Sequence, residues 1–218
     1  HVVHIIGHKI PGNYIVERPN IPLPPIPGIH RIIKSINSGV RGIICDSMSN
    51  ICIAGYYTGT PTISDENNNN YGTLPASSGS ASFVSKFTNS LVYQWSRIID
   101  SSSNDEGRGV ACDSMNNVYI VGTYTGTPTI RDQTGSPVGT LPTATSVGAF
   151  VSKFNMNGVY QWSRIMDGFS ADVTYGLACD SMNNVCMAGT YAGTPTIKDE
   201  TGSPLATLPT ATNFRAAF

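Results

Sequence analysis

The sequence predicts an all-β fold made of tandem repeats, and three observations predict it. Near-identical segments begin at Cys45, Cys112 and Cys179, so a similar amino-acid sequence recurs every 67 residues. From Cys112 to Pro137, the second copy matches the third at 20 of 26 positions. Short runs of β-branched and aromatic residues alternate with turn formers, and the 218 residues include 22 Gly and 14 Pro. A fixed period is typical of repeat architectures, and this composition favours strands and turns.

Each repeat predicts four strands in two hairpins. In the second copy, "GVACD" and "VYIVGTY" flank the turn-forming "SMNN", and "AFVSKFN" and "VYQWSRIMD" flank "MNG". Such pairs of runs are typical of hairpins. The strands are apolar on both faces, so each sheet needs another sheet packed above and below it. Four-stranded units repeated radially meet that need, which predicts a β-propeller of four-stranded blades. A β-solenoid, whose repeats are usually much shorter, is the second choice.

An insertion separates the two hairpins of each repeat. Propeller repeats commonly have about 40–50 residues, so a 67-residue period leaves roughly 20 more. In the second copy the insertion is "GTPTIRDQTGSPVGTLPTATSVG", which predicts an additional small hairpin or an ordered loop. Its tip varies most among the copies, as expected of a solvent-facing segment. These projecting tips are the first candidate for a recognition surface.

The repeats leave an N-terminal segment outside the pattern. The Pro-rich "IPLPPIPG" predicts an extended polyproline II spacer. A propeller needs about 4–8 blades to close, so we expect ring closure to need further repeats or several copies of the chain. The predicted organisation is an arm or linker (1–29) and propeller repeats (30–218), divided into a closing strand (30–41), two repeats (42–108 and 109–175) and a partial repeat (176–218).

Charge and hydropathy exclude two classes of partner. Lys+Arg number 13 and Asp+Glu 14, for a net charge of −1, and no basic stripe is present. We therefore expect no nucleic-acid partner. No apolar run approaches the ~20 residues of a membrane-spanning helix, so no membrane span is expected.

The motifs of the second copy resemble the SBBP family of β-propeller repeats. That family carries an Asp-Ser-x-Gly-Asn-Val-Tyr-Val-x-Gly hairpin followed by an Ala-Phe-Val-x-Lys hairpin. The matching residues here are Asp113, Ser114, Asn117, Val118, Tyr119 and Gly122, and then Ala149, Phe150, Val151 and Lys153. The likeness covers about residues 30–218. It implies a propeller scaffold without enzyme activity, of the kind found in bacterial surface proteins and large DNA viruses.

The chain departs from the SBBP pattern at two features. The family's turn Gly is Asn116 here, and Asn tolerates the left-handed conformation nearly as well. The insertion between the hairpins is also long. The "NNNN" run at 67–70 and the "QWSRI" segments are closer to the viral versions.

An Asp begins each first turn, with an Asn four residues later. The pairs are Asp46 and Asn50, Asp113 and Asn117, and Asp180 and Asn184. A calcium loop needs several oxygens at alternating positions, and each turn holds one carboxylate. We therefore expect each Asp to accept hydrogen bonds from the N–H groups of its own turn. No metal site is predicted.

The five cysteines allow two interpretations. With a four-residue loop, Cys45 would face Cys52, and Cys179 would likewise face Cys186, at a separation that permits a strained disulfide. In the second copy, however, Cys112 would face Tyr119. The fold therefore does not require the bond, and the favoured interpretation is buried free thiols.

Aromatic pairs are a second set of binding candidates, beside the tips of the insertions. Tyr93 and Trp95 are two residues apart and share a strand face, as do Tyr160 and Trp162. An exposed pair could stack on a sugar ring. The favoured interpretation is packing between blades, where large aromatics bury most area.

No constellation for catalysis is visible. His1, His4 and His8 suggest a metal site, but on a strand His1 would not share the face of the other two. No repeat contains a His, which excludes a repeated catalytic triad, and no Walker-type phosphate loop occurs. We therefore expect no enzyme activity and no cofactor.

These observations predict a structural or interaction protein whose loops contact other proteins of a large assembly, with a virion or an extracellular surface favoured as its location. A lectin-like propeller that binds glycans is the alternative.

Overall fold

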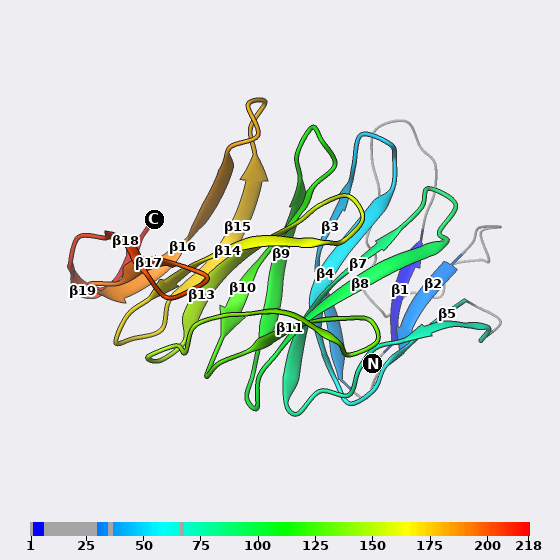
Figure 1. Ribbon diagram of the computed structural model, residues 1–218, viewed down its shortest axis with the longest axis horizontal. Helices are drawn as coiled ribbons and strands as arrows, with labels where there is room; N and C mark the ends of the chain where they lie inside the picture. Colours follow the sequence, from blue (N-terminus) through cyan, green and yellow to red (C-terminus); the bar gives the residue numbers. More distant parts are fainter. Residues whose placement is uncertain (1, 7–29, 35–36, 66–67) are drawn as a thin grey trace.

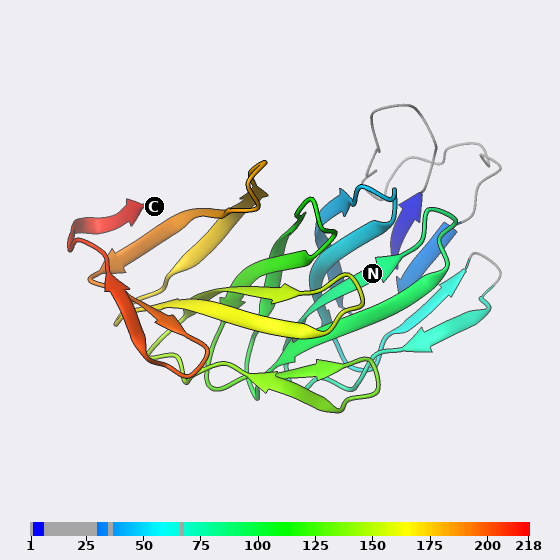
Figure 2. The ribbon, with the colours of Figure 1, turned by 45° about the horizontal axis from the view of Figure 1, so that its top comes forward.

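The protein is built from strands. The structure, a computed structural model, describes residues 2–6, 30–34, 37–65 and 68–218. Within these ranges there are 19 strands in four antiparallel sheets and no helix, so none that could cross a membrane. The sheets, numbered 1 to 4 in chain order, follow one another along the longest axis and do not meet in a closed ring (Figures 1 and 2). The predicted all-β, propeller-like class is confirmed.

Sheets 2 and 3 each contain the four strands that the sequence predicts. Sheet 2 has the order β12-β11-β8-β7-β4-β3, and sheet 3 the order β18-β17-β14-β13-β10-β9. The two outermost strands of each sheet come from the insertion of the repeat that follows. The strands of sheet 2 are β3 (Ser38–Cys45), β4 (Ile51–Thr58), β7 (Ser80–Phe87), β8 (Tyr93–Asp100), β11 (Thr129–Asp132) and β12 (Pro137–Thr140). Those of sheet 3 are β9 (Glu106–Cys112), β10 (Val118–Tyr124), β13 (Gly148–Phe154), β14 (Tyr160–Asp167), β17 (Thr196–Asp199) and β18 (Pro204–Thr207).

Sheets 1 and 4 lie at the two ends of the row. Sheet 1 contains β1 (Val2–Ile6), β2 (His30–Lys34), β5 (Thr62–Asp65) and β6 (Asn70–Thr73). Sheet 4 contains β15 (Val173–Cys179), β16 (Val185–Gly193) and β19 (Ala211–Ala217). β2 pairs with β5 as β8 pairs with β11. The Pro-rich segment of the predicted arm lies outside the described residues.

The insertions form hairpins that cross to the preceding sheet. In the second copy, β11 and β12 form the hairpin, and β11 pairs with β8 of the preceding repeat. The predicted small hairpin is formed, and its tip faces solvent as expected, with Thr134 and Ser136 exposed. The sequence did not predict that β11 pairs with a strand of the preceding repeat. An unpaired β8 would leave a row of open backbone groups, and Ile130 of β11 is fully buried in the core.

The core lies between the sheets because each central strand is apolar on both faces. Side chains alternate along β4: Ile51 and Ile53 pack in a cluster on one face, and Cys52 and Ala54 in a second cluster on the other. This second cluster includes Val110 of β9, which places it at the interface of sheets 2 and 3. The predicted stacking of sheets above and below is thus confirmed.

The first turn of each repeat is one residue shorter than predicted. In the second copy, the backbone N–H of Asp113 donates to the carbonyl of Asn117 at 3.1 Å, leaving a three-residue loop. Asn116 lies in the left-handed region, with φ of 62°. Such a residue is typical of three-residue hairpin loops that contain a bulge.

This turn shifts the register of every first hairpin. Cys45 pairs with Ile51, and Cys179 with Val185, and none of the five cysteines, all of which the structure describes, takes part in a disulfide. The predicted Cys45–Cys52 and Cys179–Cys186 facing is therefore wrong.

Candidate functional site

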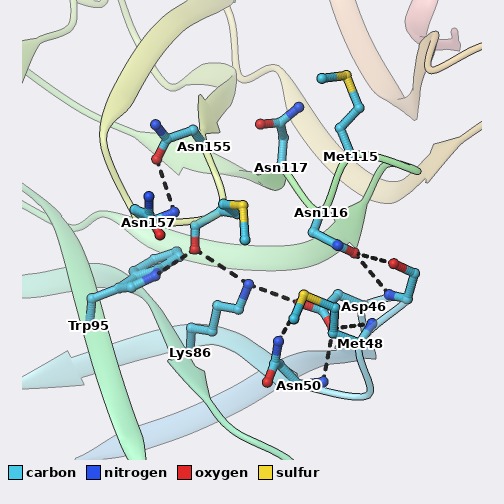
Figure 3. A network of polar contacts seen from close by, with 12 residues as sticks. Asp46, Met48, Asn50, Lys86, Trp95, Met115, Asn116, Asn117, Asn155 and Asn157 are labelled. Atoms are coloured by element: carbon cyan, nitrogen blue, oxygen red, sulfur yellow. Dashed lines mark hydrogen bonds and ion pairs between the residues drawn. The ribbon is translucent and has the colours of Figure 1, made fainter.

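The interface between sheets 2 and 3 carries a network of polar side chains (Figure 3). It lies at the end of the sheets where the three-residue turns are found. The turn between β3 and β4 supplies one side, and the turn that follows β13 supplies the other. The network joins two sheets through several side-chain contacts, so it is the candidate site.

Asp46 organises the turn between β3 and β4. Its Oδ1 accepts the backbone N–H groups of Met48 at 2.9 Å and of Asn50 at 2.8 Å. Its Oδ2 accepts the side-chain amide of Asn50 at 2.9 Å. Although burial raises the pKa of Asp46, hydrogen bonds from Lys86 and Asn50 hold that pKa below its ordinary value. The Asp side chain thus bonds its own turn.

A buried ion pair joins this turn to the middle of sheet 2. Lys86 Nζ lies 2.8 Å from Asp46 Oδ2, and the two side chains are 5% and 0% exposed. Lys86 Nζ also donates to the carbonyl of Met156 in sheet 3 at 3.4 Å. The cation is therefore held by groups on both sides of the interface.

The turn that follows β13 covers Trp95. The indole Nε1 of Trp95 donates to the carbonyl of Met156 at 3.2 Å. Gly158, at φ of 78°, lies so close that an added Cβ would be 2.7 Å from the Trp95 ring. Arg97 stacks on Trp95 and donates from Nε to the carbonyl of Gly158 at 2.6 Å. These contacts fix the second hairpin of sheet 3 against sheet 2.

Asn116 provides a second connection between the same sheets. Its side-chain Oδ1 accepts the backbone N–H of Ser47 at 2.9 Å and the Ser47 hydroxyl at 2.8 Å. The next interface repeats the pattern: Asn183 Oδ1 accepts the N–H and the hydroxyl of Ser114, both at 2.9 Å. Each repeat therefore offers donors to the repeat that follows it.

The ion pair is looser in the next copy. Lys153 Nζ lies 3.8 Å from Asp113 Oδ2, and its side chain is 23% exposed. The hydroxyl of Tyr119 donates to the same carboxylate at 2.9 Å. Although burial raises the pKa of Asp113, hydrogen bonds from Asn117 and Tyr119 hold it below its ordinary value.

The structure separates the predicted aromatic candidates. Trp95 is 5% exposed, whereas Trp162 is half-buried and lies edge-on to Tyr119 at 6.0 Å. Tyr93 and Tyr160 are half-buried, and each hydroxyl donates to a Ser of its own strand at 3.0 Å. Burial raises the pKa of both tyrosines. The two tryptophans thus lie in different environments.

The candidate metal ligands stay apart. Asp46, Asp113 and Asp180 each accept hydrogen bonds within their own turns. Among the described residues, no three His, Cys, Asp or Glu side chains gather as a metal site would require. His1 and His8 lie outside the described residues.

Sequence reasoning missed Lys86, Arg97 and Asn116 as members of the site. The signal that could have found them is their recurrence at the 67-residue period, where Lys153, Arg164 and Asn183 are the counterparts. This recurrence does not indicate which residues contact one another, because each contacting residue lies 61 to 70 residues away in the chain.

Comparison with known proteins gives a weak similarity. No family model matches the chain. The chain is 25% identical over 178 residues to an uncharacterized WD repeat-containing protein, L264, of Acanthamoeba polyphaga mimivirus. The match covers 73% of this chain and 13% of that protein, so the chain spans a small part of its relative. This similarity fits the propeller-like arrangement of sheets.

Proposed function

We propose that the chain is a non-enzymatic interaction scaffold, akin to SBBP repeats, that contacts other proteins in a large assembly such as a virion or a cell surface. One observation carries the proposal: the recurring polar side chains of the turns bond one sheet to the next instead of converging on a reactive group. The similarity to a WD repeat-containing protein supports the scaffold role.

A row of methionines supplies a presenting surface. Met48, Met115 and Met182 stand at the tips of the three-residue turns and are 58%, 69% and 77% exposed. These turns lie along one edge of the molecule, where β3 joins β4, β9 joins β10 and β15 joins β16 (Figure 1). Flexible, polarizable Met side chains are typical of surfaces that adapt to protein partners.

Replacement of the three methionines by Ser tests the scaffold role. We expect the variant to melt as the wild type does but to be lost from the large assemblies with which the wild type sediments. Matched controls at the exposed apolar residues of the inserted hairpins, Val138→Ser and Leu205→Ser, should leave sedimentation unchanged. A wild-type chain that sediments alone under native conditions would contradict the proposal.

Glycan binding is the second candidate function, and the partial exposure of Trp162 favours it. A glycan array would show weak binding that Trp162→Ala abolishes. Trp95→Ala, at the covered position, should act through stability instead. An array without signal would remove this alternative.

A further inference from the structure

Two thiols meet across the interface of sheets 2 and 3. Cys52 is the second residue of β4, and Cys112 is the last residue of β9, sixty residues later in the chain. Cys52 is fully buried in the cluster that fills this interface, and Cys112 packs against the same cluster. They come from different sheets, so the register within one hairpin does not show this pair.

The pair is not repeated at the next interface. Position 119 of β10 corresponds to position 52, and Tyr119 occupies it. Tyr119 packs in one cluster with Cys179, the counterpart of Cys112. The next interface therefore offers a comparison within the chain, because Tyr119 stands where the second thiol would be.

We propose that Cys52 and Cys112 form a disulfide that joins sheets 2 and 3 when the protein meets a small-molecule disulfide such as oxidised glutathione. In the first step, the Cys112 thiolate attacks oxidised glutathione, forms a mixed disulfide and releases one reduced glutathione. In the second step, the Cys52 thiolate attacks the Cys112 sulfur and releases the other. Two protein thiols are oxidised, one disulfide is reduced, and the two protons end on the two glutathione thiols.

Exposure sets the order of the two steps. Cys112 is half-buried, whereas Cys52 is fully buried, so a reagent from solution reaches Cys112 first. The hydrogen bond from Cys112 raises the pKa of the Cys52 thiol, and burial raises it further. Because only the thiolate attacks, the second step should be slow and should speed up with rising pH.

The bond would change how the sheets are held together. Without it, the interface depends on packing and on the contacts of Lys86, Arg97 and Asn116. With it, β4 and β9 are joined covalently and the unfolded chain is constrained by a large loop. Oxidation should therefore raise the melting temperature.

The test uses the whole chain incubated with oxidised glutathione at pH 8.5, followed by non-reducing peptide mapping and thermal melting. We expect a linked peptide that contains Cys52 and Cys112, loss of two hydrogen atoms in the intact mass, and a melting temperature several degrees higher that dithiothreitol returns to its starting value.

Variants separate this pair from the other thiols. Cys112→Ser, at the half-buried position, and Cys52→Ala should each abolish the link and the thermal shift. Cys186→Ser, at an exposed thiol, should preserve both. A map that shows Cys112 linked to Cys179, or only glutathione on Cys112, would overturn the proposal. Cys112→Ser keeps the test valid if Cys52→Ala folds poorly.

Discussion

Asn116 has two roles in the turn between β9 and β10. Its backbone adopts the left-handed conformation that closes the turn, and its side chain receives two hydrogen bonds from Ser47. A Gly at this position would meet the first requirement but not the second. An Asn at this position therefore connects neighbouring sheets without disturbing the turn.

We expect Asn116→Gly to lower the free energy of unfolding by about 1 kcal/mol, because the inter-sheet hydrogen bonds are lost. Asn116→Ala should cost about 1 kcal/mol more, since Ala does not favour the left-handed region. Urea denaturation measures both values. A Gly variant as stable as the wild type would show that the Ser47 contacts contribute nothing.

Lys86 and Lys153 occupy equivalent positions with unequal burial. Lys86→Met leaves the buried Asp46 carboxylate without its cation, and we expect a loss of about 3 kcal/mol, as for other broken buried pairs. Lys153→Met should cost about 1 kcal/mol or less, because this pair is longer and partly exposed. Equal losses in chemical denaturation would contradict this account.

Two equivalent aspartates, Asp105 and Asp172, should make stability depend on pH. Both are fully buried, and burial raises the pKa of each to about 6. Between about pH 6 and pH 4 the folded chain therefore holds protons that the unfolded chain has released. Folding takes up protons in this window, so stability should rise as pH falls from 7 to about 5.

Melting temperatures at pH 7 and pH 5 measure this effect. The rise should disappear when Asp105→Asn and Asp172→Asn are combined, since no proton is then taken up at these positions. A combined variant with the pH profile of the wild type would assign the effect to other groups.

At the scale of elements, the inserted hairpin of one repeat forms the outer edge of the sheet built by the preceding repeat. Ile130 anchors it in the core, whereas Val138 on β12 is exposed. Ile130→Ala should destabilise the chain by about 2–4 kcal/mol, and Val138→Ala should have little effect.

Hydrogen exchange distinguishes local from global effects of Ile130→Ala. The amides of β8 that bond β11 should exchange faster than those of β4, because the hairpin leaves sheet 2 first. Equal acceleration throughout the sheet would mean that the hairpin does not open separately.

Local patterns predicted the strands and turns because their causes are local. Alternating apolar runs mark the hairpins, and the Asp-to-Asn spacing marks the turns that Asp46 and Asp113 organise. The register was missed because the left-handed Asn116 shortens the loop, a backbone property that residue identity does not fix. The pairing of the inserted hairpin with the preceding sheet was missed because no residue pattern in β11 indicates that β8 is its partner. The site was missed for the same reason: Lys86 and Met156 meet only after the sheets pack.

At the scale of the whole molecule, stability depends on the interfaces between sheets. The clusters that contain Cys52 and Val110, and Tyr119 and Leu177, each draw side chains from two sheets. Neighbouring sheets should therefore unfold together, as in other repeat proteins with strong nearest-neighbour coupling.

Fluorescence of single-tryptophan variants tests this coupling. Trp162→Phe leaves Trp95, which reports on the interface of sheets 2 and 3, and Trp95→Phe leaves Trp162, which reports on the face of sheet 3 near sheet 4. After correction for the stability of each variant, the two urea transitions should coincide. Separate transitions would mean that the sheets unfold independently.

The pairing of each inserted hairpin with the preceding sheet also affects how such an array of repeats can change in length. Each repeat carries the strands that cover the outermost strand of its predecessor, as β11 covers β8 and β17 covers β14. If a duplication inserts one repeat, the hairpin of the new repeat pairs with the outermost strand of the sheet before it. The hairpin of the repeat that follows pairs with the outermost strand of the new sheet. If a deletion removes one repeat, the hairpin of the following repeat pairs with the outermost strand of the preceding sheet. Repeats can thus be gained or lost within the array without leaving an open outer strand at the junction.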